Sequence, residues 1–154
     1  MESLVQDTIE SRVRSVLAKI RSAAEKAGRP ASSVRLVAAT KTVPVQKIAE
    51  GVQAGLAILG ENRVQEALSK IPAFKPGPVQ WHFIGQLQRR KVRSVVGVFE
   101  LIHSVDSLEL AQEIDGKKVG SLVLFFEDDL RQDRSGNVFA CLGIIDDKVG
   151  ARLH

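Results

Sequence analysis

Short apolar runs recur along the first 115 residues, and each is followed by a helical pattern. The runs are Val34–Thr40, Ala57–Leu59, Trp81–Ile84 and Leu101–Val105. Their starts lie about 20 to 24 residues apart, a spacing typical of consecutive strand–helix units. The runs are continuous rather than alternating, as in parallel strands that are covered on both faces. Residues 34–115 therefore predict four βα units joined by right-handed crossovers.

An amphipathic helix is predicted ahead of these units. Apolar residues recur at three- and four-residue steps from Ile9 to Ala24, and Gly28 with Pro30 supplies a stop. Acidic and basic residues are mixed on its polar face, which favours packing against the core over binding to a membrane surface.

Four βα units fit either half of a βα barrel or an open doubly wound sheet. The glycine-rich phosphate fingerprint of a dinucleotide fold is absent after the first apolar run, which favours the barrel. We therefore predict an α/β fold, a partial (βα) barrel of about four units after an N-terminal helix, with residues 1–115 as its domain.

Residues 116–154 have a different pattern. Two apolar runs, Val119–Phe126 and Val138–Ile145, flank a polar, turn-rich loop. This predicts an atypical tail over 116–154, either a β-hairpin or the product of a truncation.

Composition narrows the class of partner. The formal net charge of +4 favours anionic ligands, whereas one Trp and no Tyr argue against a platform for stacking nucleic-acid bases. The basic cluster Arg89–Arg93 is interpreted as a solvated helix face, with a salt-sensitive interaction module as the alternative.

Three features bear on location. No apolar stretch is long enough to span a bilayer, the N-terminus lacks a secretory pattern, and Cys141 is the single cysteine. We expect a cytoplasmic protein, monomeric or homodimeric.

The ends of the predicted strands carry the residues whose side chains could bind or react with a ligand. In parallel α/β architectures, ligands bind at the carboxyl ends of the strands. Lys41, Asn62 and Ile84 stand there or close by, and His82 lies within the third run. Together they predict a pocket for a small polar ligand with a carbonyl group. The simpler alternatives are a solvated Lys41, an Asn62 that caps the next helix, and a His82 that belongs to the core.

Four sequence words occur in a fixed order, and together they resemble one family. They are Leu36-Val37-Ala38-Ala39-Thr40-Lys41-Thr42, Gly60-Glu61-Asn62-Arg63-Val64-Gln65-Glu66, Trp81-His82-Phe83-Ile84-Gly85-Gln86-Leu87-Gln88 and Ile102-His103-Ser104-Val105-Asp106-Ser107. The series closely resembles the pyridoxal-phosphate homeostasis proteins, whose barrel is similar to the N-terminal domain of alanine racemase. The resemblance runs from the first helix to about Asp115.

This resemblance implies a cofactor, pyridoxal 5'-phosphate, and a site. Lys41 matches the lysine that carries the cofactor as a Schiff base, Asn62 matches a residue lining the cofactor, and Ile84 matches one near its ring. Family members are regarded as carriers of the cofactor in vitamin B6 homeostasis rather than enzymes. A racemase-like enzyme is the alternative, but it needs a second acid–base group, and the chain has no Tyr. The neutral amine that the chemistry needs further implies that Lys41 is partly withdrawn from water or close to another cation.

The resemblance stops near Gly116. A complete βα barrel takes about 250 residues and eight strands. The phosphate-binding loops that the family places near its C-terminal end have no counterpart in the 154 residues. A truncated fragment without function is therefore a further alternative, and cofactor affinity is expected to be reduced.

Overall fold

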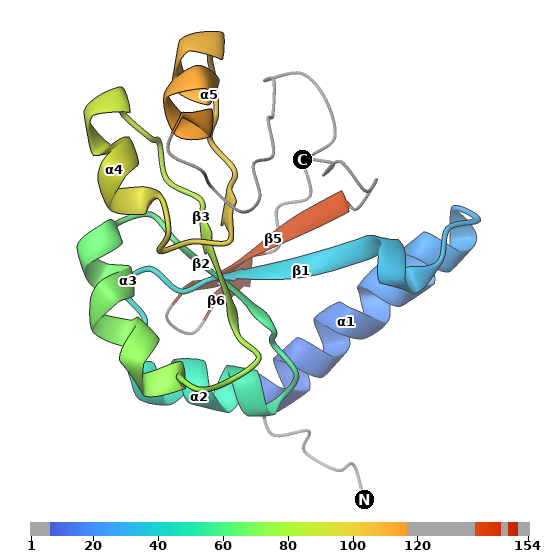
Figure 1. The fold of residues 1–154 in the computed structure, drawn as a ribbon. Coiled ribbons are helices and arrows are strands. Elements are labelled where there is room, and N and C mark those ends of the chain that lie inside the picture. Colours follow the sequence, from blue (N-terminus) through green and yellow to red (C-terminus); the bar gives the residue numbers. More distant parts are fainter. Residues whose placement is uncertain (1–6, 117–137, 146–147, 151–154) are drawn as a thin grey trace, which may run out of the picture.

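The computed structural model describes residues 7–116, 138–145 and 148–150. Its helices are α1 (Ile9–Lys26), α2 (Val45–Gln53), α3 (Val64–Lys70), α4 (Val92–Val95) and α5 (Leu108–Asp115), with short 3-10 turns η1 (Ala31–Ser33), η2 (Ile71–Phe74) and η3 (Arg89–Lys91). Its strands are β1 (Val34–Ala39), β2 (Ile58–Glu61), β3 (Gln80–Phe83), β4 (Leu101–Ile102), β5 (Val138–Ile145) and β6 (Lys148–Gly150). Figure 1 shows the helices arranged around the outside of the strands.

The strands form one sheet in the order β4-β3-β2-β1-β5-β6. Neighbouring strands from β4 to β5 pair in parallel, and β6 pairs antiparallel with β5. The predicted fold class is confirmed: an N-terminal helix precedes four parallel strands that alternate with helices. The third helical segment is the least regular, because it consists of η3 followed by the four residues of α4.

Helix α1 begins with a reciprocal cap. The Thr8 hydroxyl accepts from the Ser11 N–H at 3.1 Å, and the Ser11 hydroxyl accepts from the Thr8 N–H at the same distance. Such caps satisfy N–H groups that have no partner within the helix. The helix buries Val13 and Ala24 as its apolar spacing predicts, whereas Leu17 stays 37% exposed.

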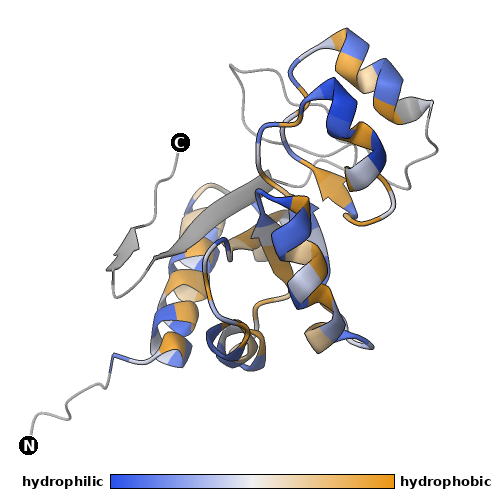
Figure 2. Ribbon diagram, turned by 90° about the vertical axis from the view of Figure 1, so that its left-hand side faces the viewer, coloured by the Kyte–Doolittle hydropathy of each residue, from blue (hydrophilic) through white to orange (hydrophobic). Residues whose placement is uncertain are grey.

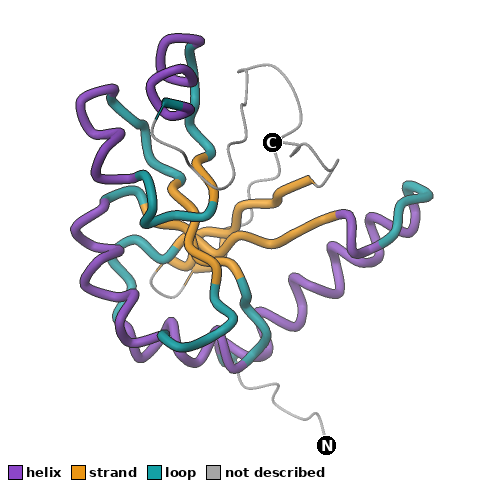
Figure 3. The backbone as a smooth tube through the Cα atoms, viewed as in Figure 1, coloured by secondary structure: helices purple, strands orange, loops and turns teal. Residues whose placement is uncertain are grey.

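The main hydrophobic core lies between the strands and the helices. Alternate strand residues point into it, namely Ala38, Leu59, Trp81, Phe83 and Ile102. We call this side of the sheet the helix-facing side. Trp81 and Phe83 are thus core residues, as expected, and each is 3% exposed. In Figure 2 the central strands are largely hydrophobic whereas the helices carry hydrophilic stretches, and Figure 3 shows the helices in an arc along one side of the strands.

The opposite side of the sheet, which we call the inner face, has a smaller apolar cluster. Val37, Ile58 and Leu101 are buried there, with Ile84 packed against them. Because successive strand residues point to opposite faces, one short strand serves both clusters.

The tail contributes a strand that the sequence predicted and a pairing that it did not. The prediction of a strand over Val138–Ile145 is confirmed by β5. This strand runs parallel to β1 and pairs with all of β1, from Val34 opposite Val138 to Ala39 opposite Gly143. It thereby satisfies backbone groups at the β1 edge. The other half of the predicted hairpin, residues 119–126, lies outside the described residues, and the described antiparallel partner of β5 is β6. The boundary between a domain over 1–115 and a tail over 116–154 stays a prediction.

Candidate functional site

The strand register brings the predicted site residues into one row. Ala39 pairs with Gly60, and Glu61 pairs with Phe83. Continued past the strand ends, this register sets Lys41 beside Asn62 and Asn62 beside Ile84. The alternation of side chains also assigns all three to the inner face. The structure thus places the three residues at the same end of the sheet, just beyond the ends of β1, β2 and β3.

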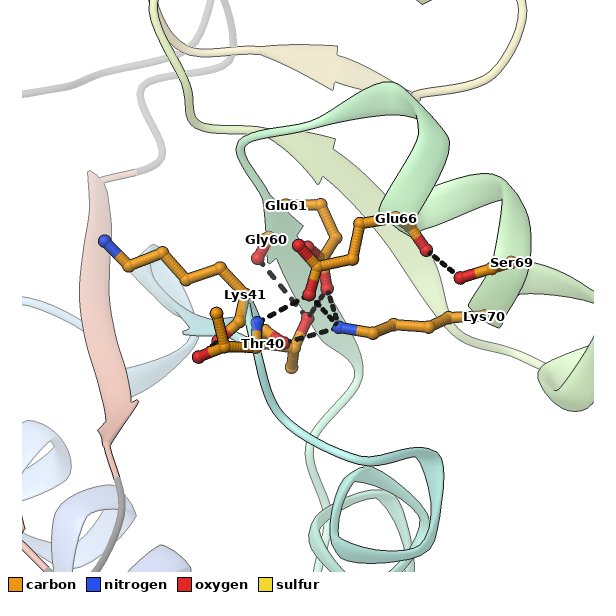
Figure 4. Close-up of polar contacts among 8 residues, drawn as sticks. Thr40, Lys41, Gly60, Glu61, Glu66, Ser69 and Lys70 are labelled. Atoms are coloured by element: carbon orange, nitrogen blue, oxygen red, sulfur yellow. Dashed lines mark hydrogen bonds and ion pairs between the residues drawn. The ribbon is translucent and has the colours of Figure 1, made fainter.

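Lys41 is the exposed member of this row. It follows β1 directly, and its side chain is open to solvent. Figure 4 shows the amine directed toward β5 and away from Glu61, Glu66 and Lys70. Of the two predicted alternatives, withdrawal of this amine from water is not found in the described structure, in which Lys41 is exposed, and proximity to another cation stays a prediction.

Asn62 does not cap a helix, contrary to the simpler alternative. Helix α3 has Arg63 at its N-cap position, and no side chain caps it. The amide oxygen Oδ1 of Asn62 is buried, and no donor among the described residues bonds to it. A buried acceptor without a partner costs free energy, which a ligand that donates a hydrogen bond would recover.

Two glycines allow the backbone and Ile84 to approach closely beside Asn62. A Cβ atom on Gly60 would lie 2.9 Å from Ile84 Cδ1 and 3.1 Å from Val37 Cγ1. A Cβ atom on Gly85 would lie 2.6 Å from the carbonyl oxygen of Asn62. These glycines therefore let Ile84 lie over the second strand and let the third strand end pack against the backbone of Asn62.

A histidine pair lies on the inner face at β3 and at the end of β4. His82 Nδ1 and His103 Nε2 are 2.9 Å apart, and both rings are buried. Burial, followed by the charges of His103 and Arg35, lowers the pKa of His82 to about 3. The His82 ring is therefore neutral at physiological pH. The sequence placed His82 in the core correctly but gave His103 no role, because the register that joins them is visible only in the folded sheet.

The helix-facing side of the same strand ends holds a network of charged residues that the sequence missed. Lys70 Nζ donates to Glu61 Oε1 at 2.8 Å, to Glu66 Oε1 at 2.7 Å and to the Thr40 carbonyl at 2.7 Å. The Thr40 hydroxyl donates to Glu61 Oε1 at 2.7 Å. Glu61 is fully buried and Lys70 is 6% exposed. The signal in the sequence was the four-residue spacing of Glu66 and Lys70 on one helix.

Burial and bonding act in opposite directions on Glu66. Desolvation, the largest influence, raises the pKa of this carboxyl group. Hydrogen bonds from Lys70 and from the Thr42 N–H, together with the charges of Lys70 and Arg63, outweigh it, so the pKa lies below its usual value. Glu66 is therefore ionised and acts as an acceptor at neutral pH.

Other classes of site find little support in the described part of the chain. The basic residues Arg89, Arg90, Lys91 and Arg93 are exposed, as expected for a solvated surface. Within residues 7–116, 138–145 and 148–150, no group of three or more His, Cys, Asp or Glu side chains is arranged to hold a metal ion. None of the described helices is both long and apolar enough to cross a membrane.

Comparison with known proteins gives several similar sequences. A pyridoxal phosphate homeostasis protein of Aquifex aeolicus is 48% identical over 103 residues, which cover 67% of this chain and 45% of that protein. The corresponding protein of Pseudomonas aeruginosa is 41% identical over 115 residues, covering 75% and 50%. The protein of that name from Escherichia coli is 39% identical over 107 residues, covering 68% and 46%. No family model matches the chain.

Solved structures agree with the sequence comparison. PipY of Synechococcus elongatus, with PLP bound, has a TM-score of 0.56 and 38% identity, covering 70% of this chain and 53% of PipY. A protein of unknown function from Bifidobacterium adolescentis has a TM-score of 0.65 and 37% identity, covering 75% and 53%. The chain spans about half the length of the curated relatives it matches.

Proposed function

Because this chain belongs to the pyridoxal phosphate homeostasis protein family over about 70% of its length, we propose that it binds pyridoxal 5'-phosphate on Lys41 without catalysing a reaction. The observation that carries the proposal is the row formed by Lys41, Asn62 and Ile84 at the carboxyl ends of β1, β2 and β3. A structural neighbour that shares the fold at 38% identity holds PLP.

The residues present fit part of this cofactor. When bound, pyridoxal phosphate supplies an aldehyde that condenses with a lysine amine, forming a C=N bond and releasing water. Lys41 presents an accessible amine, and the buried Oδ1 of Asn62 would accept a hydrogen bond from a polar group of the ring. Ile84, half-buried over Gly60, would provide an apolar contact for the ring.

The absence of catalysis belongs to the proposal. Proton transfer on a bound amino acid needs an acid–base group close to the reacting carbon. Two ionisable side chains of the inner face, His82 and His103, are buried. The carboxylates of Glu61 and Glu66 are engaged with Lys70 on the other side of the strand ends. A cytoplasmic location and a monomeric or homodimeric state stay predictions.

Covalent trapping tests the proposal. The protein is mixed with pyridoxal phosphate and reduced with borohydride, and the modified peptides are mapped by mass spectrometry. We expect one dominant adduct on Lys41, which Lys41→Ala abolishes. Lys47→Ala, a change at an exposed lysine of α2, is the matched control and should leave the adduct unchanged. Label scattered over surface lysines would contradict the binding site, and turnover of an amino acid that depends on Lys41 would contradict the non-catalytic role.

A further inference from the structure

The turn that carries Lys41 is held from both sides by one helix. On one side, Lys70 Nζ donates to the carbonyl of Thr40 at 2.7 Å. On the other side, the Thr42 N–H donates to Glu66 Oε1 at 2.5 Å. Glu66 and Lys70 are one turn apart on α3 and are joined by a 2.7 Å ion pair. The backbone groups immediately before and after Lys41 are therefore bonded to the same pair of side chains.

The conformation of the turn needs such support. Thr42 has a φ of +63°, in the left-handed region that β-branched residues rarely adopt. Its hydroxyl donates to the carbonyl of Lys41 at 2.6 Å. Strained backbone of this kind persists only where the surroundings fix it, and it is concentrated at functional sites.

The supporting helix is itself anchored to the sheet. Lys70 also bonds to Glu61, a fully buried residue at the end of β2. We call Glu66 and Lys70, with their bonds to Thr40, Thr42 and Glu61, the clamp. The clamp connects the end of β1, the end of β2 and α3 in one set of hydrogen bonds, visible in Figure 4. Because Glu61 and Asn62 are adjacent, the same anchor fixes the two strand ends from which Lys41 and Asn62 project.

We infer that Glu66 and Lys70 are positioning residues, which fix the backbone on both sides of Lys41 and so fix where its amine leaves the end of β1. This inference rests on the proposed function, since it assigns the clamp a purpose in capturing an aldehyde ligand. Holding a reactive group in one geometry before the ligand arrives lowers the entropic cost of binding.

Variants at Glu66 test the inference in the full chain. Glu66→Ala removes the acceptor of the Thr42 N–H, whereas Glu66→Gln keeps an acceptor at that place. Glu50→Ala, an exposed acid on α2, is the matched control. We expect Glu66→Ala to weaken retention of pyridoxal phosphate about tenfold, Glu66→Gln to restore most of it, and Glu50→Ala to have no effect.

Two readouts separate positioning from stability. The circular dichroism of the bound chromophore reports how firmly it is held, and it should fall in Glu66→Ala even where binding is saturated. Hydrogen exchange of the Thr42 amide, measured without ligand, should be faster in Glu66→Ala than in Glu66→Gln.

A Glu66→Ala variant with unchanged retention and dichroism would overturn the inference and leave the proposed function standing. If the unaltered protein forms no adduct on Lys41, the proposed function fails and the purpose assigned to the clamp falls with it. Unchanged Thr42 exchange in the Ala variant would disprove the clamp itself.

Discussion

The two sides of the same strand ends differ in how their polar groups are bonded. On the helix-facing side, Thr40, Glu61, Glu66 and Lys70 share hydrogen bonds and ion pairs, although Glu61 Oε2 is buried without a partner among the described residues. On the inner face, one residue further along each strand, Lys41 is exposed and Asn62 has a buried oxygen without a described partner. Consecutive residues thus serve opposite purposes. Under the proposed function, one side would fix the geometry and the other would leave groups available for a ligand.

If the proposed site holds a ligand, this contrast would allow its backbone to be held in place while the site stays open. A binding residue gains from being held in place, but its reactive atom has to stay free. The alternation of side chains along a strand meets both needs, because the supporting contacts are made by neighbours in the sequence that point the other way.

The largest expected effect comes from breaking the helix-facing side. Lys70→Met removes the cation that bonds to the buried Glu61, and an unpaired buried charge typically costs about 3–5 kcal/mol. We expect urea unfolding to show a loss of this size in the free energy of unfolding. The double variant Lys70→Met with Glu61→Leu should recover much of it, since two apolar groups replace the pair. A double variant as unstable as the single one would contradict this account.

A change of pH should distinguish the two sides. The pKa of His82 is lowered to about 3, so the unfolded chain binds more protons than the folded one below pH 6.5. The contribution of His82 should therefore lower the free energy of unfolding of the protein as pH falls, by roughly 2 kcal/mol between pH 6.5 and 5.

The helix-facing side should respond at a lower pH. The pKa of Glu66 lies below the ordinary value of a glutamate carboxyl group, so the stability it contributes is present above that ordinary value and is lost as pH falls through the lowered pKa. Urea unfolding at a series of pH values, with His82→Gln as the comparison, checks both windows. A His82→Gln variant with the original slope between pH 6.5 and 5 would show that another group is responsible.

The smallest effect should come from the inner face. Asn62→Ala removes an acceptor that has no described partner, so the free energy of unfolding should change by less than about 1 kcal/mol. Thr40→Val, on the other side, takes a hydrogen bond from the buried Glu61 and should cost about 1–3 kcal/mol. The order should reverse when retention of pyridoxal phosphate is measured, with Asn62→Ala the more damaging change. Equal stability losses in the two variants would remove the contrast.

Much of the fold was predictable because its signals are local. Continuous apolar runs identified β1, β2, β3 and β4, and helical spacing identified α1, α2 and α3. The irregular segment from η3 to α4 was less clear, since its few helical residues leave little periodicity to detect. The pairing of β5 with β1 was not predictable, because an apolar run does not specify which edge it will join.

The sequence suggested the members of the proposed site, which stay a prediction, but not their environment. Lys41, Asn62 and Ile84 follow from their positions at strand ends and from the family words. The exposure of Lys41, the missing cap at Asn62 and the contact between His82 and His103 depend on neighbours that are distant in the sequence. Lys70 is the clearest case, because a lysine at the end of a helix is usually solvated and only the packing of α3 on the sheet buries it.

The sequence by itself determined which residues reach the carboxyl ends of the strands, since apolar runs and breakpoints are encoded residue by residue. The tertiary structure decided which face each of them serves and which partners it meets. Register, helix packing and burial arise from contacts between segments far apart in the sequence, from 21 residues between Ala38 and Leu59 to 104 between Val34 and Val138, and no local pattern specifies those contacts.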